Sequence, residues 1–434
     1  MKRYKRYNSY KDSGFVWIGE IPSHWEASTI NALTKVVSRK NRPSEPLLSV
    51  YRDYGVILKS SRDDNYNKPG QDLNAYKFVK PTNLVLNKMK TWQGSLGVSE
   101  LQGIVSPAYI TCELDISNVF PKYLHYLLRC HNYIYEYNRL SYGVRTNQWD
   151  MRYDDFKKIP VFLPSKQEQH AIAAFLDRKI TEIDRFIASE EKLIAQLNGQ
   201  RAVIINHAVT KGLDSDVQMT TSKVKWIVEM PKHWTITKLK YTSNIPVTYG
   251  LNIEADRYTT EGIRLIRITD IDEKGGLRKG GVYLPENCVP REQMLNGYDL
   301  LLSRSGATVG KSYLHLEAGQ YTSAGYLVRF NFGDYYTSKF IYYVTQSHFY
   351  RNWLEQQIII ATIQNVNGEK YSNFQLPIPS HQERKHIVNF LNYKTKQIDE
   401  FVSKERQKID LIKQYRQVLI SQAVTGKIDV RGTV

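Results

Sequence analysis

An internal duplication constrains the fold of this chain more than any other feature of its sequence. The segment Ile21-Pro-Ser-His-Trp25 recurs half a chain later as Met230-Pro-Lys-His-Trp234. A second segment, Leu163-Pro-Ser-Lys-Gln-Glu168, recurs as Ile378-Pro-Ser-His-Gln-Glu383, and the match continues in one register through the residues that follow. Fixed-register matches of this density indicate that one structural unit is used twice. The chain of 434 residues is therefore expected to fold as two related copies.

Between these matched flanks the two copies differ, and only a weak similarity remains. Leu84-Val-Leu-Asn-Lys88 resembles Leu300-Leu-Leu-Ser-Arg304, and Ser106-Pro-Ala-Tyr109 lines up with Ser323-Ala-Gly-Tyr326. One fold with different side chains in its middle is what we expect of two domains that read different sequences.

Each copy ends in a segment with the pattern of one long helix. The stretch from Lys166 to about Thr210 contains no proline, and its counterpart at 381–425 contains neither proline nor glycine. Ser165, with Glu168 three residues later, has the pattern of a capping box, and the second copy repeats it. Each helix would be about 65 Å long.

Both helices carry apolar residues at alternating spacings of four and three, which is typical of a coiled-coil seam. The apolar seam positions are Leu176, Ile180, Ile183, Ile187, Ile194 and Leu197 in the first copy, and Leu391, Ile398, Val402, Ile409, Ile412 and Leu419 in the second. A narrow apolar stripe needs a partner, and the matching helix of the other copy is the nearest candidate. The alternative is that each helix packs on its own domain.

The sequence therefore predicts an α+β protein in which two mixed α/β domains are separated by an antiparallel two-helix coiled coil, related by a pseudo-two-fold axis. The predicted boundaries are 1–162 and 214–377 for the domains, and 163–213 and 378–434 for the helical regions. Within the seam, we expect Glu190 to face Arg416 and Arg201 to face Glu405, which would fix the register. Inside the domains, residues 120–140 and 337–357 have helical spacing, and runs such as Lys77–Val79 read as strands.

The charge of the chain indicates a polyanionic partner. Sixty Lys and Arg residues against 43 Asp and Glu give a net charge of +17, and the 31 tyrosines suit polar interfaces. The sequence has no apolar run long enough to span a membrane, no signal peptide, and three widely spaced cysteines. These features predict a cytoplasmic protein that binds nucleic acid and does not enter a membrane.

Polar loops between the predicted strands and helices hold the candidate DNA contacts. Arg and Lys suit guanine edges, Asn and Gln suit adenine, and Ser and Thr suit phosphates. The candidates are Lys88, Lys90, Trp92, Arg145, Asn147 and Gln148 in the first copy, and Arg304, Ser305, Lys311, Thr362, Gln364 and Asn365 in the second. A solvated loop remains the alternative for each of them taken singly.

Three segments resemble catalytic or metal-binding motifs but lack residues that those motifs need. Gly306-Ala-Thr-Val-Gly-Lys-Ser312 has one residue too few between its glycines for a phosphate loop. Ser106-Pro-Ala-Tyr109 lacks the second proline of an adenine methyltransferase motif, and no glycine turn for a methyl donor accompanies it. Asp270-Ile-Asp-Glu-Lys-Gly275 begins like a calcium loop but has lysine at the fifth position. No metal site and no catalytic residue is predicted.

Taken together, these residues resemble the specificity subunits of type I restriction–modification enzymes over essentially the whole chain. The resemblance rests on Trp17-Ile-Gly-Glu-Ile-Pro-Ser-His-Trp25 with its second copy, on the two helix starts, and on the Gly306 loop. It implies two target-recognition domains that each read one half of a bipartite DNA target, with helices that space the domains and dock two methyltransferase (modification) subunits. It also implies a chain that is not itself an enzyme and binds no cofactor. S-adenosylmethionine, ATP and Mg would belong to the modification subunits and to motor-nuclease restriction subunits. The first loop, Lys88-Met-Lys-Thr-Trp-Gln-Gly94, departs from the pattern at 306.

Two other classes of protein compete with this reading. A stand-alone nuclease or methyltransferase would need a catalytic motif of its own, and none is found in the sequence. An adaptor that recruits proteins without reading DNA is disfavoured by the basic charge and by the divergent interiors of the two copies.

Overall fold

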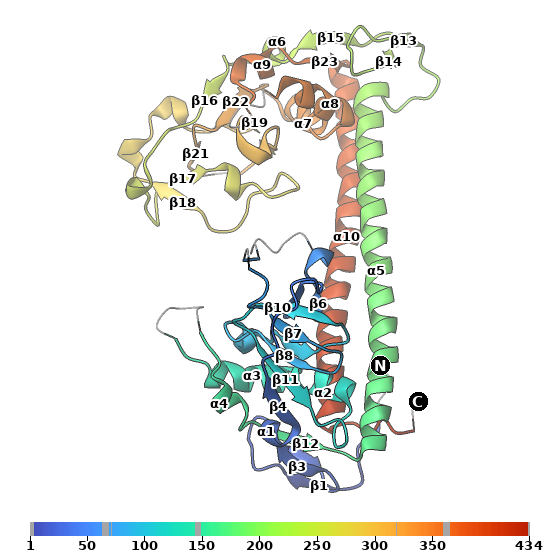
Figure 1. Ribbon diagram of the computed structural model, residues 1–434. Helices are drawn as coiled ribbons and strands as arrows, with labels where there is room; N and C mark the ends of the chain where they lie inside the picture. The colour runs from blue at the N-terminus through green and yellow to red at the C-terminus, as the bar shows by residue number, and fades with distance from the viewer. Residues whose placement is uncertain are drawn as a thin grey trace. The chain divides into compact units, whose positions relative to one another are not determined.

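The computed structural model of the chain describes residues 4–62, 69–70, 72–143, 149–317, 319–358 and 365–432. The chain forms two compact units, one made of residues 1–190 with 406–434 and the other of residues 191–405. Each unit contains one globular domain and one half of each of two long helices, α5 (Lys166–Lys211) and α10 (His381–Val424) (Figure 1).

The globular domain of the first unit combines small antiparallel sheets with short helices. In chain order its elements are β1 (Tyr10–Asp12), β2 (Glu20–Pro22), β3 (Glu26–Thr29), α1 (Ile30–Leu33), β4 (Thr34–Val37), β5 (Leu48–Tyr51), β6 (Gly55–Leu58), β7 (Lys77–Val79), β8 (Leu84–Leu86), β9 (Leu96–Val98), β10 (Gly103–Val105), β11 (Ile110–Leu114), α2 (Pro121–Leu128), α3 (His131–Leu140), α4 (Tyr153–Phe156) and β12 (Pro160–Leu163). Its largest sheet has the strand order β4-β11-β8-β9.

The second unit repeats this plan. Its elements are β13 (Met219–Thr221), β14 (Glu229–Pro231), β15 (Thr235–Lys238), α6 (Leu239–Thr242), β16 (Thr248–Tyr249), β17 (Ile263–Ile266), β18 (Val282–Leu284), β19 (Asp299–Ser303), β20 (Ser312–Leu314), β21 (Tyr321–Ser323), β22 (Leu327–Asn331), α7 (Tyr335–Val344), α8 (His348–Gln357), α9 (Gly368–Ser372) and β23 (Gln375–Ile378). The strand order β16-β22-β19-β20 matches the sheet of the first unit element by element. The expected mixture of helices and strands is therefore present in both halves of the sequence.

The two segments with helical spacing each form two helices. Residues 120–140 contain α2 and α3, and residues 337–357 contain most of α7 and all of α8. The break between α7 and α8 lies at a serine, because Ser347 adopts an extended conformation and its hydroxyl accepts the Tyr350 N–H at the start of the next helix. Continuous apolar spacing across the break hid this turn in the sequence.

The duplicated sequence motifs form one clamp at the start of each long helix. In the first unit, the Glu168 carboxylate accepts hydrogen bonds from His24 Nε2 at 2.8 Å and from Trp25 Nε1 at 3.1 Å. The same contacts recur in the second unit, where Glu383 accepts from His233 Nε2 and Trp234 Nε1, both at 2.9 Å. The expected capping boxes are half formed, since Ser165 and Ser380 Oγ accept the glutamate N–H while both carboxylates bind the His-Trp pair.

The clamp of the first unit has an additional donor, and we expect Glu168→Ala to destabilise that unit more than Glu383→Ala destabilises the other. Tyr7 donates its hydroxyl to Glu168 Oε1 at 2.6 Å, and burial and this bond raise its pKa well above the ordinary value. Alanine at 168 would leave the buried Tyr7 and Trp25 donors unbonded, at a cost of about 1–3 kcal/mol. Urea unfolding followed by hydrogen exchange in each unit would measure both losses, and equal losses would contradict the expectation.

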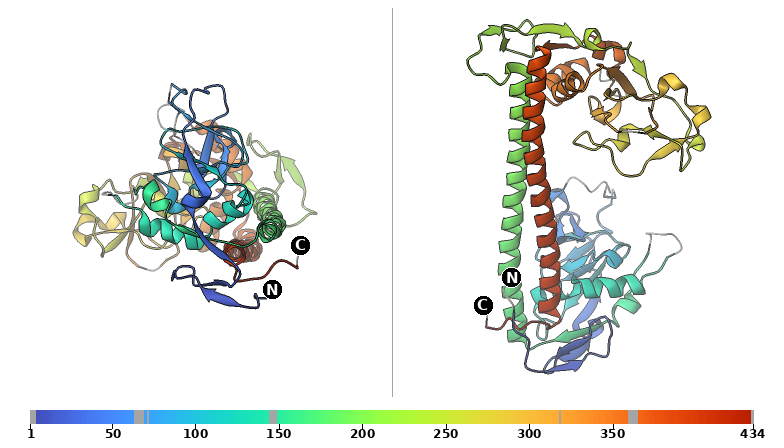
Figure 2. Two further views of the ribbon diagram at one scale, coloured as in Figure 1. Left: turned by 60° about the horizontal axis from the view of Figure 1, so that its bottom comes forward. Right: turned by 180° about the vertical axis from the view of Figure 1, so that it is seen from behind.

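The two long helices lie side by side in each unit (Figures 1 and 2). In the first unit, Arg416 Nη1 lies 2.7 Å from Asp184 Oδ1, and Lys408 Nζ lies 3.0 Å from Glu190 Oε1. Residue numbers rise along one helix as they fall along the other, so the two helices run antiparallel there. In the second unit, Arg201 Nε lies 3.6 Å from Asp399 Oδ1.

These contacts give the seam arginines carboxylate partners other than the expected ones. Arg416 meets Asp184 and Arg201 meets Asp399, each about two turns from the glutamate that the heptad pattern suggested. None of the apolar seam positions is exposed. Leu176, Ile183, Ile187, Ile194, Leu391, Val402, Ile409 and Leu419 are buried, and Ile180, Leu197, Ile398 and Ile412 are half-buried. In the second unit, the end of α5 and the start of α10 also join the core of the domain, so packing on a domain and packing between helices coexist.

Candidate nucleic-acid interface

The first domain contains an open polar groove beside the loop that follows β8. Its volume is about 830 Å3, and its walls are the β5–β6 hairpin, the residues after β8 and the segment before β11. Asn87 Nδ2 donates to the Tyr109 hydroxyl at 3.3 Å, and Lys77 Nζ donates to the Tyr109 carbonyl at 2.5 Å. Burial raises the pKa of Tyr109, so its hydroxyl remains protonated. The groove also exposes Lys90 to solvent.

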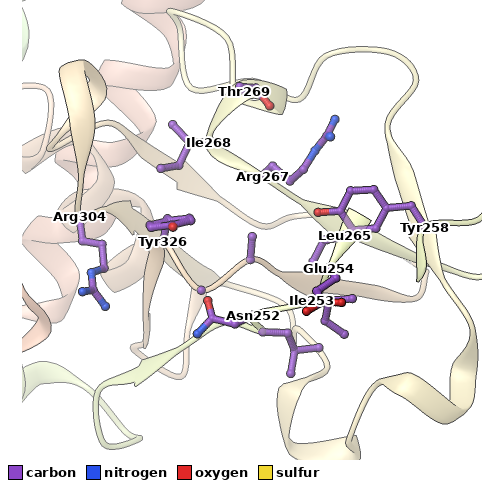
Figure 3. A pocket seen from close by; sticks show the side chains of 13 residues that line it. Asn252, Ile253, Glu254, Tyr258, Leu265, Arg267, Ile268, Thr269, Arg304 and Tyr326 are labelled. Atoms are coloured by element: carbon purple, nitrogen blue, oxygen red, sulfur yellow. The ribbon is translucent and has the colours of Figure 1, made fainter. Parts of the chain in front are cut away.

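The second domain has a groove of nearly the same size, about 810 Å3, beside the loop that follows β19 (Figure 3). The Arg304 guanidinium lies 5.0 Å from the centre of the Tyr249 ring and has no hydrogen-bond acceptor within the described part of the chain. Arg267 is already engaged, because its Nη2 lies 2.9 Å from Asp270 Oδ1. Tyr326 is 60% exposed at the groove.

The two grooves occupy equivalent places in the duplicated fold. Each lies between the loop that follows the central strand, β8 or β19, and the segment that leads into β11 or β22. The backbone that frames them also matches, because Met151 N–H donates to the Lys88 carbonyl at 3.1 Å and Val366 N–H donates to the Arg304 carbonyl at 2.9 Å. The side chains that line the two grooves differ. Equivalent frames with unlike linings can bind the same class of polymer with different sequence preference.

Comparison with known proteins finds a matching family model and similar chains. Residues 22–198 match the family model of the type I restriction modification DNA specificity domain. Over 450 aligned residues the chain is 22% identical to the specificity subunit of the type I restriction enzyme MjaVIII of Methanocaldococcus jannaschii, and the match covers 99% of this chain and 98% of the relative. The chain is therefore similar, over its whole length, to a specificity subunit of a type I restriction enzyme, and its first half matches the DNA specificity domain.

Other relatives agree with this placement. The EcoKI specificity subunit of Escherichia coli K12 is 26% identical over 208 residues, which is 46% of this chain and 44% of the relative. A solved chain, from work on the complex assembly and conformational transition of a type I R-M system, superposes with a TM-score of 0.69 at 13% identity. That superposition covers 93% of this chain and 98% of the solved one, and it supports the fold.

In the first domain, the candidate DNA contacts Lys88 and Trp92 lie against Asp150 and Trp149. Lys88 Nζ lies 2.8 Å from Asp150 Oδ2, and the ring centres of Trp92 and Trp149 are 5.0 Å apart. Lys90 lines the groove. The remaining candidates of this domain, Arg145, Asn147 and Gln148, lie outside the described residues.

In the second domain, the candidate Arg304 lines the groove, and the candidate Lys311 is bonded elsewhere. Ser305 forms a β-bridge with Asn365, directly beside Arg304. Lys311 donates to the Ile271 carbonyl at 2.9 Å, lies 3.2 Å from Glu273 Oε1, and does not line the groove. Thr362 and Gln364 lie outside the described residues.

Several polar groove residues were not identified from the sequence. Arg52, Lys59 and Gln93 line the first groove, and Asn252 and Thr269 line the second. Most lie in loops far in sequence from the candidate segments, so only tertiary contacts bring them to the site. One available signal was the Arg52-Asp-Tyr-Gly55 turn, where Gly55 has a φ of 74°.

The described ranges contain neither a cluster of three or more His, Cys, Asp or Glu side chains placed to hold a metal ion nor a helix apolar and long enough to cross a bilayer. Asp270 and Asp272, which begin the calcium-like segment, bind other protein groups. Asp270 bonds to Arg267, and Asp272 Oδ1 accepts the Lys274 and Gly276 N–H groups.

Proposed function

We propose that this specificity subunit reads a split and asymmetric target on double-stranded DNA, one half with each domain. The observation that carries the proposal is the pair of grooves framed by equivalent backbone and lined by unlike side chains. A single fold used twice would present both grooves in the same way to the duplex. Because the linings differ, the two half-targets would have different base sequences.

The long helices, within regions 163–213 and 378–434, would act as the spacer between the domains at 1–162 and 214–377. The opposite running direction at Asp184–Arg416 and Glu190–Lys408 supports an antiparallel coiled coil with a pseudo-two-fold axis. Two readers related in this way would meet one face of B-DNA about one helical turn, or about 10 bp, apart.

The groove residues and their neighbouring loops would make the contacts with DNA. Lys90, Arg304, Ser305 and Asn365 have the strongest support, because they line the grooves or lie beside them. Lys88, Trp92, Arg145, Asn147, Gln148, Lys311, Thr362 and Gln364 complete the proposed set. With a net charge of +17, phosphate contacts should make the affinity fall steeply as salt rises.

The subunit would direct partner enzymes and catalyse nothing itself. We propose that its helical regions dock two methyltransferase subunits and that motor-nuclease restriction subunits join them in the cytoplasm. S-adenosylmethionine, ATP and Mg would be bound by these partners. Support comes from the family, whose similar members are named as specificity subunits of restriction enzymes, and from a structural neighbour studied for complex assembly.

A domain exchange tests this function directly. We expect that replacing residues 25–160 with the equivalent segment of another specificity subunit changes one half of the methylated motif and leaves the other half and the spacer unchanged. Each groove is built within one unit, so its readout should move with that unit. The measurement is methylome sequencing of a host that expresses the chimera with its cognate methyltransferase.

The matched control exchanges residues 235–376 and should change the other half only. A change in both halves after either exchange would contradict reading by separate domains. If the chain assembles with the methyltransferase but the complex shows no DNA sequence preference, the chain is instead an adaptor that recruits proteins without reading DNA.

A further inference from the structure

Asn252 lines the second groove, and the position of its side chain depends on the neighbouring Gly325. A Cβ built on Gly325 would lie 1.9 Å from Asn252 Oδ1, so only glycine at 325 allows the amide to occupy this place. The backbone on either side is fixed, because Leu251 N–H donates to the Ser323 carbonyl and Gly325 N–H donates to the Leu251 carbonyl, both at 2.7 Å. The backbone at Leu251 and Gly325 is therefore fixed, and the missing side chain of Gly325 leaves the space that the Asn252 amide occupies.

The Asn252 amide is also unused by the protein. Its residue is exposed at the groove, and its side chain has no hydrogen-bond partner among the described residues. An exposed amide that lines a groove and forms no hydrogen bond within the described residues is available to a ligand.

Two further side chains surround this amide with groups that suit a nucleobase (Figure 3). The Arg304 N–H donates to the Tyr326 carbonyl at 3.0 Å, which ties the residue that follows Gly325 to the arginine. Arg304 rests on Tyr249, whose hydroxyl accepts the Gly368 N–H at 2.9 Å, so the guanidinium has a fixed support and free donors. Tyr326 presents an exposed ring and hydroxyl beside both.

We propose that Asn252 reads an adenine in the half-target of the second domain. An asparagine amide offers one donor and one acceptor, which match adenine N7 and the N6 amino group in the major groove. Arg304 and Tyr326 lie beside it to contact the neighbouring base or phosphate. The inference rests on the proposed function, since it requires that this groove meets DNA.

Two variants test the role of the amide in different ways. Asn252→Ala removes it, whereas Gly325→Ala leaves it in the chain but forces it out of place, because the new Cβ occupies its position. Gly297→Ala is the matched control, since a Cβ there meets no atom within 4 Å. Each variant is assembled with its methyltransferase, and the base preference at every position is measured by binding to a randomised DNA library and by methylome sequencing.

We expect Asn252→Ala to lower the preference for one adenine of the second half-target by about 10- to 100-fold and to leave the first half unchanged. Gly325→Ala should lower the preference at the same position, and Gly297→Ala should behave as wild type. Asn252→Asp should move the preference at that position from adenine toward cytosine, because a carboxylate only accepts.

The inference is overturned if the second half-target contains no adenine, if Asn252→Ala leaves every base preference unchanged, or if it weakens all positions equally. Thermal unfolding of each variant separates loss of folding from loss of readout, and Asn252→Ala alone decides the matter should Gly325→Ala not fold. A wild-type protein with no split motif would refute the proposed function itself. A split motif that is insensitive to Asn252 would refute the reading of adenine only.

Discussion

Replacing Asp299 with alanine should destabilise the second unit by about 3–5 kcal/mol, one of the two largest effects that we expect of this chain. Asp299 is completely buried, and the side chain of its partner Arg329 is 6% exposed. The Arg329 Nε atom lies 2.7 Å from Asp299 Oδ2, in an ion pair between the neighbouring strands β19 and β22. Removal of the carboxylate would leave a buried guanidinium without its counter-charge, which is far more costly than loss of a surface pair.

The carboxylate is held by neutral donors as well. Asn331 Nδ2 donates to Asp299 Oδ1 and the Asn296 N–H donates to Oδ2, both at 2.7 Å. Burial nevertheless raises the pKa of Asp299 above its ordinary value, since loss of water outweighs these bonds and the nearby arginine. The pair as a whole therefore adds little to stability, although breaking it is costly.

The first unit supplies the matched control. Its sheet has Asn83 and Thr111 at the places of Asp299 and Arg329, and Asn83 Oδ1 accepts the Lys80 N–H just as Asp299 accepts the Asn296 N–H. The double variant Asp299→Asn with Arg329→Thr reproduces that neutral pair. It should recover most of the stability lost by Asp299→Ala, as measured by urea unfolding of the full chain. A double variant less stable than the single one would refute this explanation.

The fold was largely predictable because the residues that recur in sequence form the same contacts in both units. Trp25 with Glu168 and Trp234 with Glu383 recur in sequence because each pair joins a domain to the start of a long helix. What the pattern did not reveal was the partner of each seam charge. A heptad pattern fixes which face of a helix is apolar, but the pairing of Arg416 with Asp184 depends on the axial offset between the two helices.

The candidate site was predictable only where its residues are close in sequence to a repeated strand. Arg304 and Ser305 follow the strand that matches Leu84-Val-Leu86. The sequence similarity between the two strands therefore indicated the loop that contains Arg304 and Ser305. Asn252 gave no such signal, because it reaches the groove through backbone contacts with residues 323–325, far along the chain. Lys311 had a suitable charge, but its ammonium group is bonded within the domain. The residue type alone does not show that Asn252 lines the groove and that Lys311 does not.

Acidification should destabilise the first unit well before its carboxylates titrate. The half-buried His125 ring lies between the Val98 carbonyl, 3.2 Å from Nδ1, and Arg129 Nη1, 2.7 Å from Nε2. The neutral ring satisfies both neighbours, because Nδ1–H donates to the carbonyl and Nε2 accepts from the guanidinium. Burial, followed by the positive charge of Arg129, lowers the pKa of His125 to about 3.

The sign of the effect follows from this lowered pKa. Above the unfolded pKa of about 6.5, His125 is neutral in both states and its full contribution to stability is present. As the pH falls below that value, His125 becomes protonated in the unfolded chain but stays neutral in the folded unit. Stability is therefore lost until the pH reaches the folded pKa of about 3. The loss should reach about 2 kcal/mol at pH 5 and about 4–5 kcal/mol at pH 3, at about 1.4 kcal/mol per pH unit.

The measurement is urea unfolding between pH 7.5 and pH 5, with hydrogen exchange of α2 reporting on the first unit. His125→Asn keeps a donor and an acceptor but does not titrate, so the variant should be less stable at pH 7.5 yet nearly independent of pH over this range. Lys122 and Arg129, the other charged groups that act on the ring, remain protonated throughout, so they cannot mimic the effect. His315 in the second unit has a lowered pKa of its own, which is why the exchange signal is taken from α2. A wild-type first unit that is equally stable at pH 7.5 and pH 5 would show that the ring is protonated in the folded state without cost.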